Sequence, residues 1–317
     1  MSQPWPPPLR RGDPVHLVAA SSTLAGPGAA ERLAAGVALL ESWGLVVEPA
    51  EAERVLGRQW GYLAGRDEER AADLTPGAAL LACVRGGWGA ARLLERPLEL
   101  PAGWLLGFSD VTSLLWAQLA QGKRGGIHGP LLTNLAAEPA WSQERLRALL
   151  FGEPLPALQG EGWRGGVAEG PLLAANLTVA THLLGTPHLP QLRGAILVLE
   201  EVGEVPYRID RLLTHWRLSG ALAQLAGLAF GSFLGCEEDG QEERAGETPS
   251  ETDGDPREPQ PPDRFGLGEV LRERSLDLGI PVVAELPVGH APGNGALPLG
   301  AWARLDGDRG TLELLGP

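Results

Sequence analysis

Gly103-Trp-Leu-Leu-Gly-Phe-Ser109-Asp110-Val-Thr112-Ser-Leu-Leu115 is an apolar run that reaches a serine and continues as apolar residues at helical spacing. This pattern predicts a buried strand, a sharp turn, and a helix capped by Asp110 or Thr112. A serine on such a turn projects from the end of a sheet beside a free backbone N–H, and an acyl-transfer hydrolase needs both. Because Asp110 and Val111 follow the serine, the G-x-S-x-G motif is incomplete, and a serine that simply begins a helix is the alternative.

The residues around this stretch predict an α/β domain over 13–150, preceded by a disordered, proline-rich arm over 1–12. Buried strands alternate with helical patterns, and this order favours a parallel sheet. The carboxyl ends of parallel strands usually carry the functional groups, and Gly86, Gly87 and Ser109 are expected there. The strands are expected at 15–22, 45–49, 78–85 and 104–108, and the helices at 29–43, at 67–74, after Gly86 and from Ser109.

A second, β-rich α/β domain is predicted over 169–317, after a linker at 151–168 that is rich in glycine and proline. Between 237 and 263 the chain carries eleven acidic residues and two arginines, a net charge of −9 out of −14 for the whole protein. Such a segment cannot bury apolar surface, so we predict a disordered acidic insert. The elements expected in this domain are helices at 177–184, 208–216 and 265–278, strands at 194–201, 225–233 and 281–290, and a closing hairpin of 297–305 with 311–315.

Composition narrows the classes of protein and of site. With 44% hydrophobic residues in 317, the chain can bury a sizeable core. No apolar run in it is long enough for a membrane span, and we expect no secretory leader, because the first residues contain no apolar segment. Its two distant cysteines argue against a disulfide framework and fit the cytoplasm. No His or Cys pair has the spacing of metal ligands and no basic stripe is visible, so we expect no metal, no cofactor and no nucleic-acid partner.

Three side chains with catalytic chemistry stand at the ends of predicted strands: Ser109, Glu200 or its neighbour Glu201, and His290. A serine needs a base within hydrogen-bond reach, histidine is the usual base, and a carboxylate fixes its tautomer. Spacing alone leaves alternatives open for each residue. His128 is a rival base, His290 could be a loop histidine bonded to backbone, and Arg208 or Arg211 could pair with the carboxylate.

The glycine-rich segment Arg85-Gly-Gly-Trp-Gly89 permits two interpretations. It could cradle a phosphate, but neither G-x-x-x-x-G-K-[ST] nor G-x-G-x-x-G is present. We favour a tight turn whose backbone N–H is a second oxyanion donor, because it follows the strand that precedes the serine strand.

Several ordered motifs make residues 13–317, apart from the acidic insert, resemble the LD-carboxypeptidases of serine peptidase family S66, which also contains the microcin C immunity hydrolases. The motifs are Arg85-Gly-Gly-Trp-Gly-Ala-Ala-Arg-Leu-Leu, Gly107-Phe-Ser-Asp-Val-Thr-Ser-Leu, Asn176-Leu, Gly185-Thr-Pro, Leu197-Val-Leu-Glu-Glu-Val-Gly-Glu-Val-Pro-Tyr-Arg-Ile-Asp-Arg-Leu-Leu, Gly289-His290 and Leu297-Pro-Leu-Gly.

The resemblance implies a parallel α/β domain, a β-rich domain, an active site between them and a homodimer. It assigns Ser109 as nucleophile, His290 as base and Glu200 as the carboxylate, with oxyanion donors at the backbone N–H of Gly87 and Asp110. Two more residues, Asn176 and Trp88, are the expected substrate contacts. The family usually has Gly-Gly where this chain has Ala174-Ala175 before the asparagine, and the added methyl groups could narrow the cleft.

We therefore predict a cytoplasmic serine carboxypeptidase that removes the terminal D-alanine from muropeptide tetrapeptides in peptidoglycan recycling. One alternative keeps the same three residues and changes the substrate to an aminoacyl-nucleotide analogue, as in microcin immunity. The other is a catalytically silent protein that binds cell-wall peptides. The expected partner is a muropeptide, with no membrane association.

Overall fold

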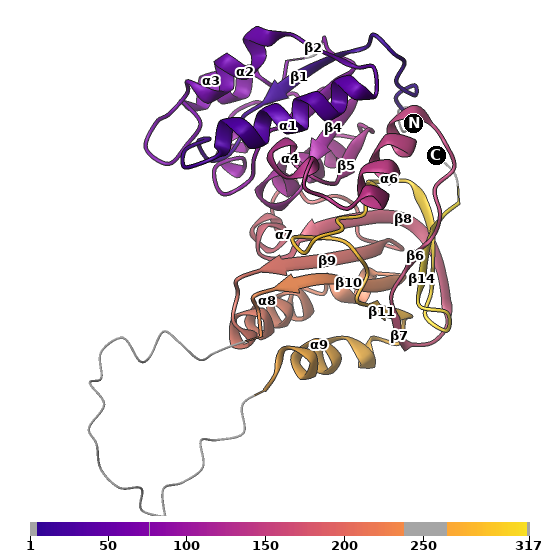
Figure 1. Ribbon diagram of the computed structural model, residues 1–317. Helices are drawn as coiled ribbons and strands as arrows, with labels where there is room; N and C mark the ends of the chain where they lie inside the picture. Colours follow the sequence, from indigo (N-terminus) through magenta and orange to yellow (C-terminus); the bar gives the residue numbers. More distant parts are fainter. Residues whose placement is uncertain (1–4, 76, 238–264, 316–317) are drawn as a thin grey trace, which may run out of the picture.

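The computed structural model describes residues 5–75, 77–237 and 265–315, and it contains two sheets that lie one above the other in Figure 1. The N-terminal sheet has six strands, of which the first five in chain order are parallel and the sixth comes from the C-terminal half of the chain. In spatial order these are β12 (Leu297–Pro298), β5 (Gly126–His128), β4 (Trp104–Gly107), β3 (Leu80–Cys83), β1 (Pro14–Val18) and β2 (Val46–Val47).

The parallel strands β3 and β4 are buried along their whole length, as an apolar run covered on both faces requires. The connecting segments are α1 (Ala29–Ser42), α2 (Pro49–Leu56), α3 (Asp67–Ala72), the 3-10 turns η1 (Ala91–Glu95) and η2 (Ser109–Val111), α4 (Thr112–Ala120), α5 (Leu132–Leu135) and α6 (Ala140–Phe151).

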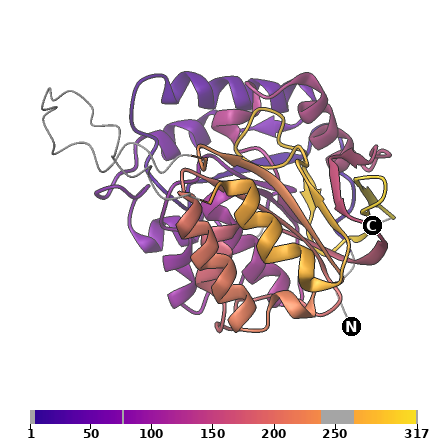
Figure 2. The same ribbon diagram turned by 90° about the horizontal axis from the view of Figure 1, so that it is seen from below.

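The C-terminal sheet has eight strands, and β8 to β11 at its centre are parallel. Its order is β6 (Leu158–Gln159), β14 (Thr311–Leu314), β13 (Trp302–Asp306), β8 (Val167–Asn176), β9 (Ile196–Val202), β10 (Gly227–Leu234), β11 (Val282–Ala284) and β7 (Glu161–Arg164). The helical segments are α7 (Leu177–Leu183), α8 (Pro206–Leu218), α9 (Leu267–Ser275), η3 (Leu222–Gln224) and η4 (Leu276–Leu278). Figure 2 shows α8 and α9 side by side on the outer face of this sheet.

The two sheets share one core. Buried residues of α4 from the N-terminal part and of β8, β9 and α7 from the C-terminal part belong to a single hydrophobic cluster. The Trp116 indole in α4 donates to the Ala174 carbonyl oxygen in β8 at 3.0 Å and meets Trp216 of α8 edge-on. Helix α4 is thus apolar nearly all round because it packs between the two sheets.

The structure confirms the α/β class, with an N-terminal parallel sheet and a C-terminal β-rich part, but it corrects several boundaries. The predicted linker contains the strands β6 and β7. In the predicted hairpin, residues 302–306 do pair with 311–314, whereas Leu297 and Pro298 pair with β5 in the other sheet. The helix expected after Gly86 is only the 3-10 turn η1, and α2 and α6 were not predicted.

The described part of the N-terminal arm is ordered, contrary to prediction. Leu9 is buried and its N–H donates to the Leu150 carbonyl oxygen at 2.8 Å. Trp5 packs against Trp104, whose indole N–H donates to the Pro7 carbonyl oxygen. Trp5 and Leu9 give this proline-rich segment the apolar contacts that hold it against the N-terminal domain, and the overall composition of the segment did not indicate them. The acidic insert predicted at 237–263 lies outside the described residues, apart from Glu237.

Among the residues that the structure describes, no helix is long and apolar enough to cross a membrane.

Candidate active site

Ser109 lies on a sharp turn between β4 and α4, with a backbone φ of 61°. This left-handed conformation is costly for a residue with a side chain, and it aims the hydroxyl away from the sheet. Two glycines make room for the turn. A Cβ on Gly107 would lie 2.7 Å from Val111, and a Cβ on Gly86 would lie 3.2 Å from the Ser109 Oγ.

His290 approaches this serine on the loop that runs from β11 in one sheet to β12 in the other. Its Nε2 lies 3.2 Å from the Ser109 Oγ, and its Nδ1 lies 2.6 Å from the Glu200 Oε2. The prediction that His290 ends a strand is wrong, because β11 stops at Ala284 and Glu285 turns the chain with a φ of 55°. The loop is what carries the imidazole from one domain to the other.

Glu200 and Glu201, adjacent in β9, have different partners. The Glu200 side chain is fully buried and faces His290, so it pairs with neither Arg208 nor Arg211. Glu201 accepts hydrogen bonds from the Asn176 side-chain amide at 2.7 Å and from the Thr178 N–H at 2.8 Å. The period of two in a strand sends one carboxylate toward the serine and the other to the start of α7.

Polar contacts fix the loop that carries His290. The Gly289 N–H donates to the Asn294 Oδ1 at 3.0 Å, and the Ala291 N–H donates to the Ser232 Oγ at 3.2 Å. Farther along, a Glu138 carboxylate oxygen accepts from the N–H groups of Gly293 and Asn294. The ring of Phe108 packs on the imidazole, with 4.6 Å between ring centroids. Sequence reasoning missed these residues, because polar residues and one aromatic far apart in sequence give no local pattern.

Neither predicted helix cap acts as one. The buried Asp110 carboxylate accepts from the Ala90 N–H at 2.8 Å, which ties the turn after β4 to the turn after β3, and burial raises its pKa. The Thr112 hydroxyl accepts from the Asn176 N–H at 3.2 Å, across the contact between the two sheets. Both side chains therefore position the serine turn instead of capping α4.

The glycine turn after β3 lines the same cavity as Ser109. The Gly87 N–H donates a hydrogen bond to no described residue. Ser22 holds the turn, since its N–H donates to the Gly86 carbonyl oxygen and its hydroxyl accepts from the Trp88 N–H at 3.0 Å. The first N–H groups of a helical turn also lack partners within the helix, and Asp110 occupies such a position after Ser109. The N–H groups of Gly87 and Asp110 can thus serve as oxyanion donors.

The ring of His128, the rival base, packs edge-on against Phe108, with 5.7 Å between ring centroids, and forms no hydrogen bond to Ser109. Its side chain is fully buried, and neither ring nitrogen has a hydrogen-bond partner among the described residues. Burial lowers the pKa of His128 to about 3, so the imidazole stays neutral at ordinary pH. It does not compete for the serine proton.

A cavity of about 380 Å³ opens at Ser109 and His290. Its walls come from the loop before α1, the glycine turn and the start of α5. Its lining side chains include Arg32 and Arg85 but no aspartate or glutamate.

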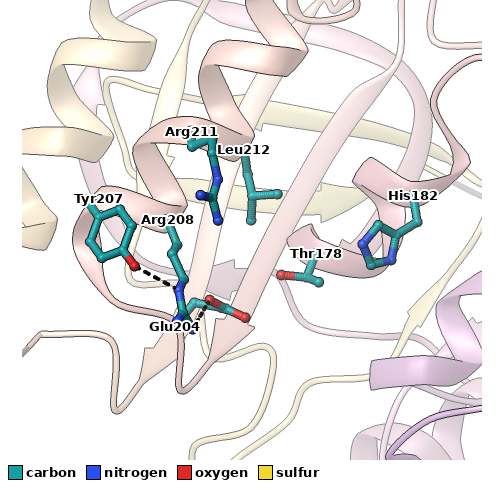
Figure 3. Close-up of a pocket in the computed structure, with 7 residues that line it drawn as sticks. All are labelled: Thr178, His182, Glu204, Tyr207, Arg208, Arg211 and Leu212. Carbon is teal, nitrogen blue, oxygen red and sulfur yellow. Dashed lines mark hydrogen bonds and ion pairs between the residues drawn. The ribbon is translucent and has the colours of Figure 1, made fainter. Parts of the chain in front are cut away.

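A second pocket of about 350 Å³ lies between α7 and α8, where side chains from both helices and from the preceding loop point into a common space (Figure 3). It mixes charges, because Glu204 lies 3.5 Å from Arg208. The exposed Trp88 ring meets His182 of this pocket edge-on, with 6.4 Å between ring centroids. The Trp88 side chain therefore extends from the glycine turn to the edge of the second pocket.

Asn176, by contrast, is buried. Its amide nitrogen donates to Glu201 and its oxygen accepts from the Val179 N–H at 3.1 Å, at the first turn of α7. These bonds favour a positioning role over the predicted substrate contact. Within the described residues no cluster of three or more His, Cys, Asp or Glu side chains could hold a metal ion.

Comparison with known proteins shows the family of this chain. Residues 15–129 match the model of the LD-carboxypeptidase N-terminal domain, and residues 169–305 match that of the C-terminal domain. The Synechocystis protein named "Putative carboxypeptidase slr1534" is 45% identical over 98% of this chain and 97% of its own. The chain belongs to the LD-carboxypeptidases, peptidase family S66. It is therefore a serine carboxypeptidase by family.

Further proteins are similar to this chain in sequence or in fold. The murein tetrapeptide carboxypeptidase of Pseudomonas aeruginosa is 32% identical over 79% of this chain and 81% of its own. The fold matches the muramoyltetrapeptide carboxypeptidase of Oxalobacter formigenes, with a TM-score of 0.74 and 24% identity over 94% of this chain and 97% of that one. It also matches MccF in complex with glutamyl sulfamoyl guanosine, with a TM-score of 0.77 and 20% identity over 98% of both chains.

Proposed function

We propose that this LD-carboxypeptidase hydrolyses the bond between an L-centre and the terminal D-alanine of muropeptide tetrapeptides, with Ser109, His290 and Glu200 as its catalytic triad. The observation that carries the proposal is the relay from the Ser109 Oγ through His290 to the buried Glu200, at 3.2 and 2.6 Å. The names of relatives at 29–32% identity, which specify murein peptides, support the choice of substrate.

The chemistry follows from this geometry. His290 Nε2 takes the proton of Ser109 as its Oγ attacks the carbonyl carbon, and Glu200 stabilises the imidazolium that forms. The N–H groups of Gly87 and Asp110 then hold the oxyanion. The C–N bond breaks, the imidazolium gives its proton to the departing D-alanine amine, and an ester remains on Ser109. Water, deprotonated by His290, attacks that ester and releases the shortened peptide.

The experiment that tests the proposal is mass spectrometry of a muropeptide tetrapeptide incubated with the wild-type protein or with Ser109→Ala. Loss of one alanine with the wild type alone is the expected result. Loss with both proteins would remove Ser109 from the mechanism, and loss with neither would refute the substrate.

An aminoacyl-nucleotide analogue is the second candidate substrate, because the fold neighbour MccF is known in complex with glutamyl sulfamoyl guanosine. That likeness, at 20% identity, concerns the fold, whereas relatives with higher identity are named carboxypeptidases. Glutamyl sulfamoyl guanosine belongs in the same assay, and its cleavage without cleavage of the muropeptide would favour the second candidate. Labelling of Ser109 by a serine-directed probe would argue against a silent binding protein.

We also propose a role in peptidoglycan recycling in the cytoplasm, and a homodimer. The family resemblance supports both ideas, and light scattering of the purified protein tests the homodimer.

A further inference from the structure

A carboxypeptidase must recognise a free carboxylate close to the bond it cuts. In a terminal D-alanine, one carbon atom separates that carboxylate from the scissile nitrogen. The group that binds it must therefore lie in the same cavity as the nucleophile. The cavity at Ser109 and His290 contains two cationic side chains, Arg85 and Arg32, and no acidic ones.

The charge in this cavity is uncompensated within the described part of the chain. Neither Arg85 nor Arg32 forms an ion pair with a described aspartate or glutamate, whereas Arg58, Arg70 and Arg92 all do. The pocket between α7 and α8 differs, since Glu204 there faces Arg208. Of these two cavities, it is the one at the serine that combines the nucleophile with unpaired positive charge.

Arg85 is the better placed of the two arginines. It directly precedes the glycine turn, so its backbone leads to Gly87, the proposed oxyanion donor. It is half-buried, and its Nη1 donates a hydrogen bond to the Thr23 carbonyl oxygen at 2.8 Å. This bond orients the guanidinium, and its other N–H groups donate to no described residue. Arg32 is exposed and donates to the Pro27 carbonyl oxygen at 3.1 Å.

We propose that Arg85 binds the terminal carboxylate of the leaving amino acid, with Arg32 as a weaker second contact, and so makes the enzyme a carboxypeptidase rather than an endopeptidase. Guanidinium suits this task, because its planar N–H groups match the two oxygens of a carboxylate. The small residues Ala25, Gly26 and Ala29 in the same wall fit a leaving group as small as alanine. The inference rests on the proposed function and adds the group that selects a free C-terminus.

The test compares two substrates that differ only in this charge: the muropeptide tetrapeptide and the same peptide with a C-terminal carboxamide. The wild type should prefer the free acid. Hydrogen bonds to charged groups contribute about 1.5–3 kcal/mol, which corresponds to roughly 10- to 150-fold in kcat/KM. In Arg85→Met, kcat/KM for the free acid should fall by about that factor, while kcat/KM for the amide stays close to the wild-type value.

Amide hydrolysis also reports on folding, because a variant that still cleaves the amide has an intact triad. Arg85→Lys should retain part of the preference, and Arg32→Met should lose less of it than Arg85→Met. Arg193→Met is the matched control, since this exposed arginine lines neither pocket. Equal loss on both substrates in Arg85→Met, or no change on either, would overturn the inference and leave the proposed function standing. If the wild type cleaved neither substrate, both proposals would fail.

Discussion

The Glu200 Oε2 lies 2.6 Å from the His290 Nδ1, and the Glu200 side chain is fully buried. A buried carboxylate at this distance holds the Nδ1–H tautomer and leaves Nε2 free to accept the serine proton. Glu200→Gln should therefore keep the fold and lower kcat by about 10⁴-fold, as loss of the equivalent carboxylate does in other triads. Steady-state kinetics with the tetrapeptide, beside circular dichroism, measures this.

Glu201→Gln is the matched control for that variant. Its carboxylate accepts from three N–H groups, those of Asn176, Thr178 and Val202, so an amide would turn one acceptor into a donor that faces another donor. We expect a loss of stability of about 1–3 kcal/mol, with a far smaller effect on kcat than in Glu200→Gln. Equal losses of kcat in the two variants would refute the choice of Glu200 as the triad carboxylate.

The positive φ of Ser109 predicts that the backbone conformation of the nucleophile lowers the stability of the protein. Ser109→Ala and Ser109→Gly should both lower kcat by several orders of magnitude, because neither has a nucleophile. Only glycine relieves the left-handed strain, so Ser109→Gly should be more stable than Ser109→Ala by about 1 kcal/mol. Urea denaturation of the two variants measures the difference, and equal stability would show that the turn stores no strain.

His128 predicts a pH dependence of stability. With its pKa at about 3 in the folded protein and near 6.5 in the unfolded chain, the unfolded state binds the extra proton below pH 6.5. This residue therefore makes stability fall as the pH falls from 6.5 toward 3. Between pH 7.5 and pH 5 its share of the loss should be about 2 kcal/mol.

His128→Leu isolates that share, because leucine has a similar volume and no proton to bind. Free energies of unfolding of both proteins at pH 7.5 and pH 5 are the measurement. The variant should lose less stability than the wild type over this interval. An identical loss would mean that His128 is protonated in the folded protein.

The sequence predicted the elements with strong local signals. The apolar run 104–107, the serine turn and the strand that carries Glu200 lie where periodicity and chain order placed them. The choice between Glu200 and Glu201 came from the family motif, since alternation along a strand shows that they face opposite ways but not which one faces the serine.

The rest depends on contacts between distant segments. The chain crosses from the C-terminal sheet to the N-terminal sheet, where Leu297 pairs with His128. No local pattern in residues 291–298 predicts this crossing. That crossing places His290 against Ser109. Likewise, the position of Asp110 at the start of a helix predicts a cap, but its carboxylate accepts a hydrogen bond from the Ala90 N–H, 20 residues away in sequence. A side chain that could cap its own helix can instead form a hydrogen bond with a distant segment.

Gly289 predicts how tightly the triad is packed. Its φ is +119°, and a Cβ there would lie 2.5 Å from the Ser232 Oγ, 2.8 Å from the Glu200 Cβ and 2.9 Å from the Glu200 Oε2. Gly289→Ala must therefore displace the carboxylate that orients His290, and kcat should fall by at least about 10²-fold, since small misplacements of catalytic groups are that costly.

Gly220→Ala is the control, because Gly220 also has a positive φ, at +73°, but its Cβ would meet nothing within 4 Å. Both variants carry the backbone strain of alanine at positive φ, which costs about 1 kcal/mol. Gly289→Ala should lose further stability through its overlaps, and only Gly289→Ala should lose activity. If the two variants kept the same kcat, the close approach of Gly289 to Glu200 would be irrelevant to catalysis.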